Sequence, residues 1–502
     1  MKSILATGVL VLAASLAAGR PAPIPPPWTA ALHAPGAAER DSWNTAARID
    51  VDATWDGTAV VGHMDLVWRN DTGTTLTDLV LATYANQSSY HGAAMEVIAA
   101  SVDGRQVTPQ VIAEGLGVRL SLARPLAPGA SVRCTATFRH TLSRDEGYHG
   151  LACQKPDGPA VLHGWYPDLA LWADGRWQVD PLPSLCDPAR SVLAHVTAHL
   201  RVPDGGPFPV GGTVTAVEDE PGPFRLLTIV SPFTRNLTVV VGGPWVRDEE
   251  EVAGIKVRVW ATPATADATS LLREATAAAV ARCAAAFGPY PFRELDVVVA
   301  PLGEGAGGVE STGLYLIDAG ACSVATEVER GYVEMIAAHE TAHAWWYQIV
   351  GNDPLRATWL DESLTNWTTL WLLEQRSDAL RRMQEQEIVM MAVNGHTQGP
   401  FPALHPDTWK PTEEDYVGQV YGRGAVAYAA LRREVGDERW FACLRSWATA
   451  QRWHVATPAD WQAHLRTTLG GKVADRFWDR WILGQGLTPR HLMEPFRTTP
   501  TR

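Results

Sequence analysis

The strongest constraint on the fold of this chain is a change in its hydrophobic pattern about halfway along. In the first half, short runs alternate between apolar and polar side chains, as in "RIDVDATW", where the apolar positions are Ile49, Val51, Ala53 and Trp55. Alternation with a period of two is typical of a half-buried β-strand. Similar runs recur between turns such as "PDGG" and "EPGP". Residues 41–245 are therefore expected to form an all-β domain.

The second half has the pattern of helices around a short β segment. The acidic run "RDEEEVAG" at 247–254 is expected to be an exposed linker. "SLLREATAAAVARCAAAFG" predicts a helix that Gly288 ends, and "LDVVVAP" predicts a strand. From Val333 onwards helical patterns dominate. The sequence thus predicts an α+β architecture, with a second domain at 246–490 and a C-terminal tail at 491–502.

The first residues have the composition of a secretory signal. "MKSILATGVLVLAASLAAGR" begins with the positive Lys2, continues with an apolar run and ends in small residues. Cleavage is expected after one of residues 17–19, which would remove 1–19 and leave a secreted or periplasmic protein. The apolar run is short for a membrane span, but an uncleaved anchor remains an alternative that the mass of the mature chain would decide. The Pro-rich residues 20–40 are expected to form an extended linker.

Charge and cysteine content exclude some classes of protein. The 502 residues carry a formal net charge of -13, which argues against a nucleic-acid partner because a polyanion requires a basic surface. No later stretch reaches transmembrane length, so no stable membrane span is expected. The six cysteines include no CxxC pair and are expected to be buried thiols with one or two disulfides. Neither the disulfide pairing nor the oligomeric state follows from the sequence.

The stretch "AAHETAHAWW" carries the first chemical signal. His339 and His343 are four residues apart, so on a helix they lie on the same face, with Glu340 between them in sequence. HExxH is the helix signature of zinc peptidases, in which two imidazoles bind the metal and the glutamate acts on its water. The surrounding residues are apolar nearly all round, so the ionisable groups need a compensating partner such as zinc. A chance match in a buried helix is the alternative. The helix is expected to end at Val350, before "GNDP".

A catalytic zinc requires a third protein ligand. The metzincin pattern would place a glycine and a histidine at the positions of Trp346 and Ile349, so that class is excluded. Eighteen residues separate His343 from Glu362 in "WLDES", where apolar residues at helical spacing predict a second helix. This helix can pack against the first one and present Glu362 to the metal.

These motifs resemble those of the gluzincin family of aminopeptidase N and leukotriene-A hydrolase. "AHETAHAWWYQIVGND" and "WLDES" are similar to the family's HExxH and WLNEG blocks, and "GPYPFRELDVVVAP" is similar to the segment that precedes them. "GGVES" occupies the place of the GAMEN exopeptidase motif, and "YVGQVYGRGA" that of the segment with the catalytic tyrosine. The resemblance covers about residues 45–485. It implies a saddle-like all-β sandwich domain followed by a thermolysin-like zinc peptidase domain with a small sheet lobe and a helical lobe.

The resemblance also implies roles for individual residues. His339, His343 and Glu362 would bind one Zn²⁺ ion per chain. Glu340 would be the general base, and Tyr421 would donate a hydrogen bond to the oxyanion of the tetrahedral intermediate.

Four further residues would bind the peptide substrate. Glu310 would hold the free α-ammonium group, and the backbone of Gly307 and Gly308 would pair with the peptide like an added strand. Tyr416 would line the site. The remaining histidines, His149 among them, show no ligand spacing and are expected at the surface or in the core.

The chain departs from the family pattern in several places. Val309 and Ser311 replace the methionine and asparagine of the GAMEN motif. A second amine anchor, a Q-x-E/A segment in the family, has no counterpart in "ACQKPDGPAVLHGWYPDLALW", and the large C-terminal helical domain of longer members is expected to be missing. The resemblance implies an exported zinc aminopeptidase that acts on peptides. A zinc endopeptidase with an open cleft and a non-catalytic peptide-binding protein on a decayed peptidase scaffold remain alternatives.

Overall fold

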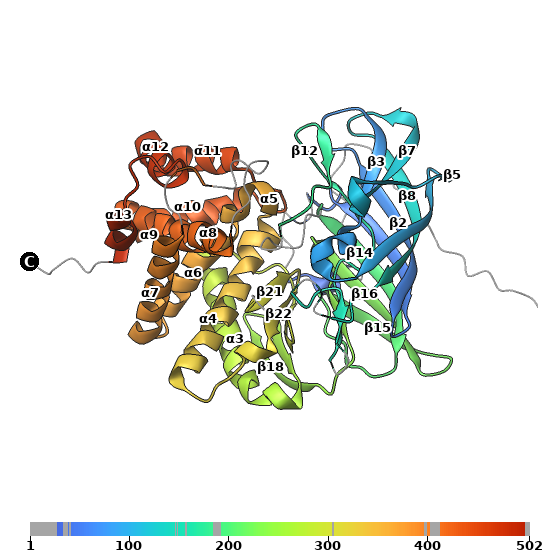
Figure 1. Ribbon diagram of the computed structural model, residues 1–502, viewed down its shortest axis with the longest axis horizontal. Coiled ribbons are helices and arrows are strands. Elements are labelled where there is room, and N and C mark those ends of the chain that lie inside the picture. The colour runs from blue at the N-terminus through green and yellow to red at the C-terminus, as the bar shows by residue number, and fades with distance from the viewer. Residues whose placement is uncertain are drawn as a thin grey trace, which may run out of the picture.

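The computed structural model has a β-rich part and a helical part that lie side by side (Figure 1). It describes residues 28–33, 39, 42–145, 147, 149–155, 158–183, 192–303, 306–395, 399–401 and 412–496. The predicted signal segment 1–19, most of the predicted linker 20–40 and residues 497–502 of the predicted tail lie outside the described residues. The α+β architecture is confirmed, because strands dominate the first half of the chain and helices the second.

The largest sheet of the β-rich part has eight strands in the order β15-β16-β14-β1-β2-β8-β4-β5. Its strands are β1 (Ala47–Trp55), β2 (Ala59–Arg69), β4 (Ala94–Val102), β5 (Arg105–Val107), β8 (Ser131–Thr141), β14 (Ala194–Pro203), β15 (Thr213–Glu220) and β16 (Phe224–Thr234). β1 and β14 pair in parallel, whereas the other neighbours are antiparallel. Along β1 the predicted inward positions, such as Val51 and Trp55, are buried and alternate with more exposed residues.

Three smaller sheets complete this part. The four-stranded sheet contains β3 (Leu76–Ala82), β6 (Gln110–Ile112), β7 (Gly117–Leu126) and β11 (Asp168–Leu169). The three-stranded sheet contains β9 (Cys153–Gln154), β10 (Ala160–Leu162) and β17 (Val239–Val241). The two-stranded sheet pairs β12 (Leu171–Ala173) with β13 (Arg176–Gln178). Buried side chains of the eight-stranded sheet, such as Phe138, share one core with those of the four-stranded sheet, such as Leu79 and Leu120. The two sheets therefore enclose a single apolar layer.

A five-stranded sheet with the order β18-β19-β20-β22-β21 begins the second part of the chain. Its strands are β18 (Val246–Val252), β19 (Ile255–Ala261), β20 (Glu294–Ala300), β21 (Gly308–Ser311) and β22 (Leu314–Asp318). β21 pairs antiparallel with β22 and is the last strand of the described sheet, so its other edge faces no described strand.

The acidic run at 247–254 is not the linker that the sequence predicts. It forms most of β18, which pairs antiparallel with β19 through a tight turn at Ala253 and Gly254, where φ is 53° and 78°. Arg273 from the neighbouring helix pairs with Asp248 at 2.9 Å. Charged side chains are common on exposed edge strands because they discourage pairing with other chains. The acidic pattern therefore marks an edge strand of the sheet.

The helical part packs on this sheet (Figure 1). Its helices are α3 (Thr269–Phe287), α4 (Glu327–His343), α5 (Pro354–Ala357), α6 (Glu362–Glu374), α7 (Asp378–Asn394), α8 (Glu413–Tyr416), α9 (Gly424–Val435), α10 (Asp437–Ala450), α11 (Pro458–Leu469), α12 (Gly471–Phe477) and α13 (Pro489–Met493), while α1 (Trp28–Ala31) precedes the first sheet. The π-helical segments η6 (Ala344–Ile349), η9 (Val417–Arg423) and η10 (Trp478–Ile482) extend three of them. Helix α3 ends at Gly288 as predicted, with φ at 115°.

Helix α4 carries the HExxH residues and begins earlier than the sequence pattern predicts. Thr326 caps it: its hydroxyl accepts the backbone N–H of Glu329, whose carboxylate accepts the N–H of Thr326 at 2.8 Å. This reciprocal cap satisfies two donors that a helix start leaves free. After His343 the helix continues into η6 and ends before Val350, as expected. Helices α3 and α6 pack on α4, which explains its apolar surface on more than one side.

Arg235 ties the β-rich part to the helical part. This buried side chain follows β16, and its guanidinium donates to the carbonyl of Tyr347 at 2.8 Å and to that of His454 at 2.9 Å. A buried cation of this kind is held by charge-assisted hydrogen bonds to carbonyl oxygens. The end of the α4–η6 helix is therefore fixed to the β-rich part.

Two sequence expectations concern cysteines and membranes. Cys134, Cys283, Cys322 and Cys443 are buried free thiols, so none of these four takes part in a disulfide. Cys186 lies outside the described residues. Among the helices that the structure describes, none combines the length and apolar character needed to cross a membrane.

Candidate active site

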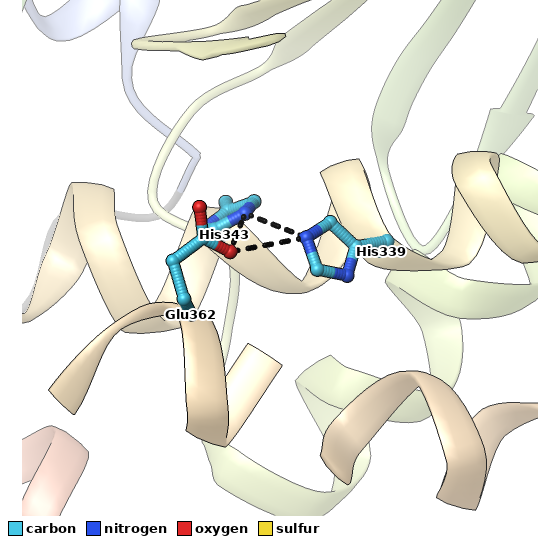
Figure 2. Close-up of side chains that lie close together, drawn as sticks. All are labelled: His339, His343 and Glu362. Atoms are coloured by element: carbon cyan, nitrogen blue, oxygen red, sulfur yellow. Dashed lines mark hydrogen bonds and ion pairs between the residues drawn. The ribbon is translucent and has the colours of Figure 1, made fainter. Parts of the chain in front are cut away.

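Helices α4 and α6 bring the three predicted metal ligands together. His339 and His343 lie one turn apart on α4, and Glu362 is the first residue of α6 (Figure 2). The His339 Nε2 atom lies 3.2 Å from His343 Nε2 and 3.2 Å from Glu362 Oε2. His343 Nε2 and Glu362 Oε2 are 3.5 Å apart. The three donor atoms thus form a nearly equilateral triangle.

This triangle fits a zinc ion. A tetrahedral zinc with bonds of about 2.0–2.1 Å keeps its ligand atoms about 3.3–3.4 Å apart, close to the observed spacing. Two imidazoles and one carboxylate are also the donor set of many catalytic zinc sites, which leave one coordination position open. The arrangement of His339, His343 and Glu362 is therefore suited to one zinc ion.

Asp361 orients one of the ligands, although the sequence pattern did not single it out. It is fully buried, and its Oδ1 atom accepts a hydrogen bond from His343 Nδ1 at 2.7 Å. This bond fixes the tautomer that leaves the Nε2 lone pair available for a metal. The other histidine has a weaker partner, because Thr369 Oγ1 lies 3.4 Å from His339 Nδ1. The only sequence signal for Asp361 is its place directly before Glu362 in "WLDES".

Glu340 lies on the pocket side of α4. Its side chain is buried, and its Oε2 atom has no hydrogen-bond partner among the described residues. Burial raises the pKa of Glu340 well above its usual range. A cation in the neighbouring ligand triangle would favour the carboxylate form. A buried carboxylate with an unused oxygen beside a metal site can exchange protons with a water or a substrate in the pocket.

Strand β21 forms the wall opposite Glu340. A Cβ atom placed on Gly308 would lie only 2.5 Å from Glu340 Oε1, so a side chain does not fit there. At Gly307 the contact is looser: a Cβ atom would lie 3.2 Å from Cδ1 of Ile336. The two glycines therefore let the edge strand approach α4 closely.

Glu310 lies farther along β21 and is buried in the same pocket. Carboxylate oxygens of Glu310 and Glu340 and a ring nitrogen of His343 all lie within 4.8 Å of one another. Burial raises the pKa of Glu310 to about 8, an effect that the neighbouring His343 opposes. A buried ammonium group beside Glu310 would supply the positive charge that its carboxylate form requires.

The substitution at Ser311 has a local explanation. Its hydroxyl donates to Asn236 Oδ1 at 2.9 Å and contacts the Thr238 hydroxyl at 2.7 Å. Asn236 also accepts the backbone N–H of Thr312 at 3.0 Å. A loop from the β-rich part therefore holds the end of β21 in place.

Tyr421 reaches the ligand triangle from η9. Its hydroxyl donates to Glu362 Oε1, and its ring is stacked on that of His339 with centroids 5.9 Å apart. The Tyr421 carbonyl accepts from Asn366, whose own carbonyl oxygen accepts from Gln384 at 3.0 Å. These two amides line the pocket and were missed by sequence reasoning, since they belong to no motif.

Tyr416 and His149 complete the wall. The Tyr416 hydroxyl is 3.1 Å from Thr358 Oγ1, and its ring is 5.9 Å from that of Tyr421. His149 comes from the β-rich part and lines the pocket, whereas the sequence predicted only a surface or core position for it. Gln154, the glutamine of the region searched for a second amine anchor, instead accepts a hydrogen bond from Arg144 at 2.6 Å.

All the predicted site residues line one pocket: His339, Glu340, His343, Glu362, Glu310, Gly307, Gly308, Tyr416 and Tyr421. Its described lining contains no lysine or arginine. The pocket is therefore acidic apart from a bound metal, and it favours cationic groups over anionic ones.

Comparison with known proteins identifies the class. Residues 274–481 match the Peptidase family M1 domain, and this range includes the three candidate zinc ligands, Glu340 and Tyr421. The chain therefore carries a peptidase family M1 domain, and its resemblance to the gluzincin family of aminopeptidase N is confirmed. The family implies one catalytic zinc ion, which agrees with the geometry of the ligand triangle.

The structural similarity to M1 peptidases covers most of the chain. The crystal structure of an M1 zinc metallopeptidase from Deinococcus radiodurans is similar with a TM-score of 0.65 at 20% identity, covering 90% of this chain and 97% of that one. A mutant of the Deinococcus radiodurans enzyme bound to a Tyr-Ser-Ala substrate is similar with a TM-score of 0.63 at 20% identity, covering 90% of this chain and 96% of that one. These matches show the shared fold.

A curated relative supports the family but is much longer. Aminopeptidase 2 of Candida albicans is 23% identical over 223 residues, which cover 42% of this chain. The match spans only 24% of that relative's length.

The contact between Asp361 and His343 generates a first prediction. Asp361→Ala removes the acceptor and is expected to weaken zinc affinity about 10- to 100-fold, the usual effect of losing such a partner. Asp361→Asn keeps an acceptor oxygen and is the matched control, expected to stay close to the native affinity. Competition with a chelator, followed by circular dichroism to verify folding, measures both. Equal affinities of the two folded variants would contradict the positioning role of Asp361.

Gly308, the first residue of β21, and Gly307, directly before the strand, generate a second prediction. Gly308→Ala forces Glu340 or the strand to move and is expected to lower kcat by at least about 10-fold, because small displacements of a catalytic group are costly. Gly307→Ala places its Cβ 3.2 Å from the flexible end of Ile336 and 3.6 Å from the Tyr332 hydroxyl, without approaching Glu340, and is expected to change kcat much less. Zinc content should be the same in both variants. If both substitutions lowered kcat equally, the close approach to Glu340 would not be the cause.

Proposed function

We propose that this protein is an exported zinc aminopeptidase that removes N-terminal residues from peptides. The observation that carries the proposal is the convergence of ligand atoms of Glu310, Glu340 and His343 within 4.8 Å of one another, beside the edge strand β21. A carboxylate suited to an ammonium group thus lies beside a candidate base and a metal ligand. The apolar N-terminal segment supports export.

Zinc held by His339, His343 and Glu362 would supply a Lewis acid and a water of lowered pKa. Glu340 would accept a proton from the attacking water and deliver it to the leaving nitrogen, for which its unpartnered Oε2 atom is available. Tyr421 would donate its hydroxyl hydrogen to the oxyanion, because it already lies beside the ligand triangle.

Glu310 and β21 would determine where the peptide is cut. The substrate backbone would pair with the free edge of β21 as an added strand, which the glycines at 307 and 308 leave accessible. Its α-ammonium group would then meet Glu310 and stop further advance. Such an arrangement places the first peptide bond at the metal, which is the geometry of an exopeptidase.

The role of Glu340 gives a third prediction. Glu340→Gln is expected to keep one zinc per chain but to lower kcat by about 10²- to 10⁴-fold, the usual contribution of acid–base catalysis. Glu327→Gln is the matched control, because Glu327 is exposed in the first turn of the same helix. Elemental analysis and turnover of a panel of aminoacyl fluorophores measure both properties.

Two outcomes would contradict this mechanism. Full activity of Glu340→Gln would exclude Glu340 as the base. A native protein that held zinc but cleaved no substrate in the panel would instead indicate a peptide-binding protein on an inactive scaffold.

The role of Glu310 gives a fourth prediction. One peptide is compared with its N-acetylated form, which lacks the ammonium charge. The native protein is expected to prefer the free amine at least about 100-fold in kcat/KM. In Glu310→Gln this preference should fall by about 10- to 100-fold, as expected for the loss of a charge-assisted hydrogen bond. Equal cleavage of both peptides by the native protein would indicate an endopeptidase.

A further inference from the structure

A second groove adjoins the active-site pocket. It lies between the first half of α4, helix α7 and the turn η5 (Ala319–Ala321), and its lining includes Val328, Met383 and Met390. Tyr332 and Glu387 line both the pocket and the groove. The two hollows therefore adjoin each other along α4, with Tyr332 and Glu387 at their junction.

The direction of β21 shows which end of a substrate would enter this groove. Glu310 lies near His343, a Cβ on Gly308 would touch Glu340, and a Cβ on Gly307 would lie 3.6 Å from the Tyr332 hydroxyl. The strand and the helix thus run side by side from the candidate amine anchor, past the candidate base, to Tyr332. A peptide anchored at Glu310 would leave the pocket between Tyr332 and Glu387.

The groove has a distinct chemical character. Val328 is 73% exposed and Met390 is 57% exposed, so large apolar side chains face solvent at its rim. Methionine side chains adapt to ligands of varied shape, which suits a site for variable side chains. The groove is apolar enough to bind side chains of a peptide without requiring a particular sequence.

The entrance to the groove is acidic. Glu387 is half-buried there and forms no ion pair with any described residue. No lysine or arginine appears in the described lining of either hollow. A carboxylate of the substrate at this entrance would therefore meet a like charge and no compensating cation.

We propose that this groove binds the part of a peptide substrate downstream of the scissile bond, and that Glu387 disfavours substrates whose free C-terminal carboxylate lies at its entrance. The substrate class is then oligopeptides, with dipeptides as poor substrates. This inference rests on the proposed aminopeptidase activity. The occupant follows from the position of the groove next to the pocket and from the charge at their junction.

The test compares three substrates with the same two N-terminal residues: a dipeptide with a free carboxylate, its C-terminal amide, and a tetrapeptide with an apolar third residue. The native zinc-loaded protein is expected to cleave the free-acid dipeptide at least about 10-fold less efficiently, in kcat/KM, than the amide. The tetrapeptide should be cleaved at least as well as the amide.

Two variants test the charge of Glu387 and the apolar surface of the groove independently. Glu387→Gln is expected to raise kcat/KM for the free-acid dipeptide several-fold while leaving the amide nearly unchanged. Glu385→Gln is the matched control on the same helix, since Glu385 pairs with Arg381 at 2.6 Å and does not line the groove. Met390→Glu, an exposed substitution, should lower kcat/KM for the tetrapeptide but not for the dipeptide amide.

The outcomes distinguish this inference from the proposed function. If none of the three substrates is cleaved, the proposed aminopeptidase activity fails. If they are cleaved but the acid and amide forms have equal kcat/KM, or if Glu387→Gln raises both equally, the inference about Glu387 is overturned. An unchanged tetrapeptide kcat/KM in Met390→Glu would overturn the assignment of the groove to downstream residues.

Discussion

The contact between the start of α6 and the second half of α4 is the arrangement on which the rest of the site depends. It brings Glu362 to the two imidazoles and Asp361 to the Nδ1 atom of one of them. Burying this many ionisable groups is costly unless each is paired or holds a metal. The neighbouring elements shield and pair these groups. α3 and β21 pack against α4, and η9 supplies the Tyr421 hydroxyl to Glu362.

Much of the fold could be predicted because its signals are local. The alternation in β1, the end of α3 at Gly288 and the end of the HExxH helix before Val350 each follow from residues close in sequence. The acidic strand β18 was missed because its side chains are exposed and charged, which removes the apolar alternation from which a strand is usually predicted. Only its pairing with β19 shows what it is.

The candidate site was predictable where it follows a motif and unpredictable where it depends on distant contacts. The three candidate zinc ligands have a recognisable spacing, whereas Asn366 and Gln384 support Tyr421 through hydrogen bonds between three separate segments. His149 and Asn236 reach the site from the β-rich part, and nothing in the sequence around them indicates that they lie there. Which residues share a pocket is determined by packing over long sequence separations.

The free edge of β21 has a consequence for what the pocket can distinguish. Main-chain hydrogen bonds are alike for every residue except proline, so a peptide that paired with this edge would be bound through its backbone and little through its side chains. Discrimination would then come from Glu310 on the strand and from Tyr332 of α4, which lies beyond Gly307. A peptidase of this kind would select substrates by the length of the peptide and by the charge at its ends. Substitutions of Glu310 or Tyr332 could then change the set of substrates without altering the residues between them.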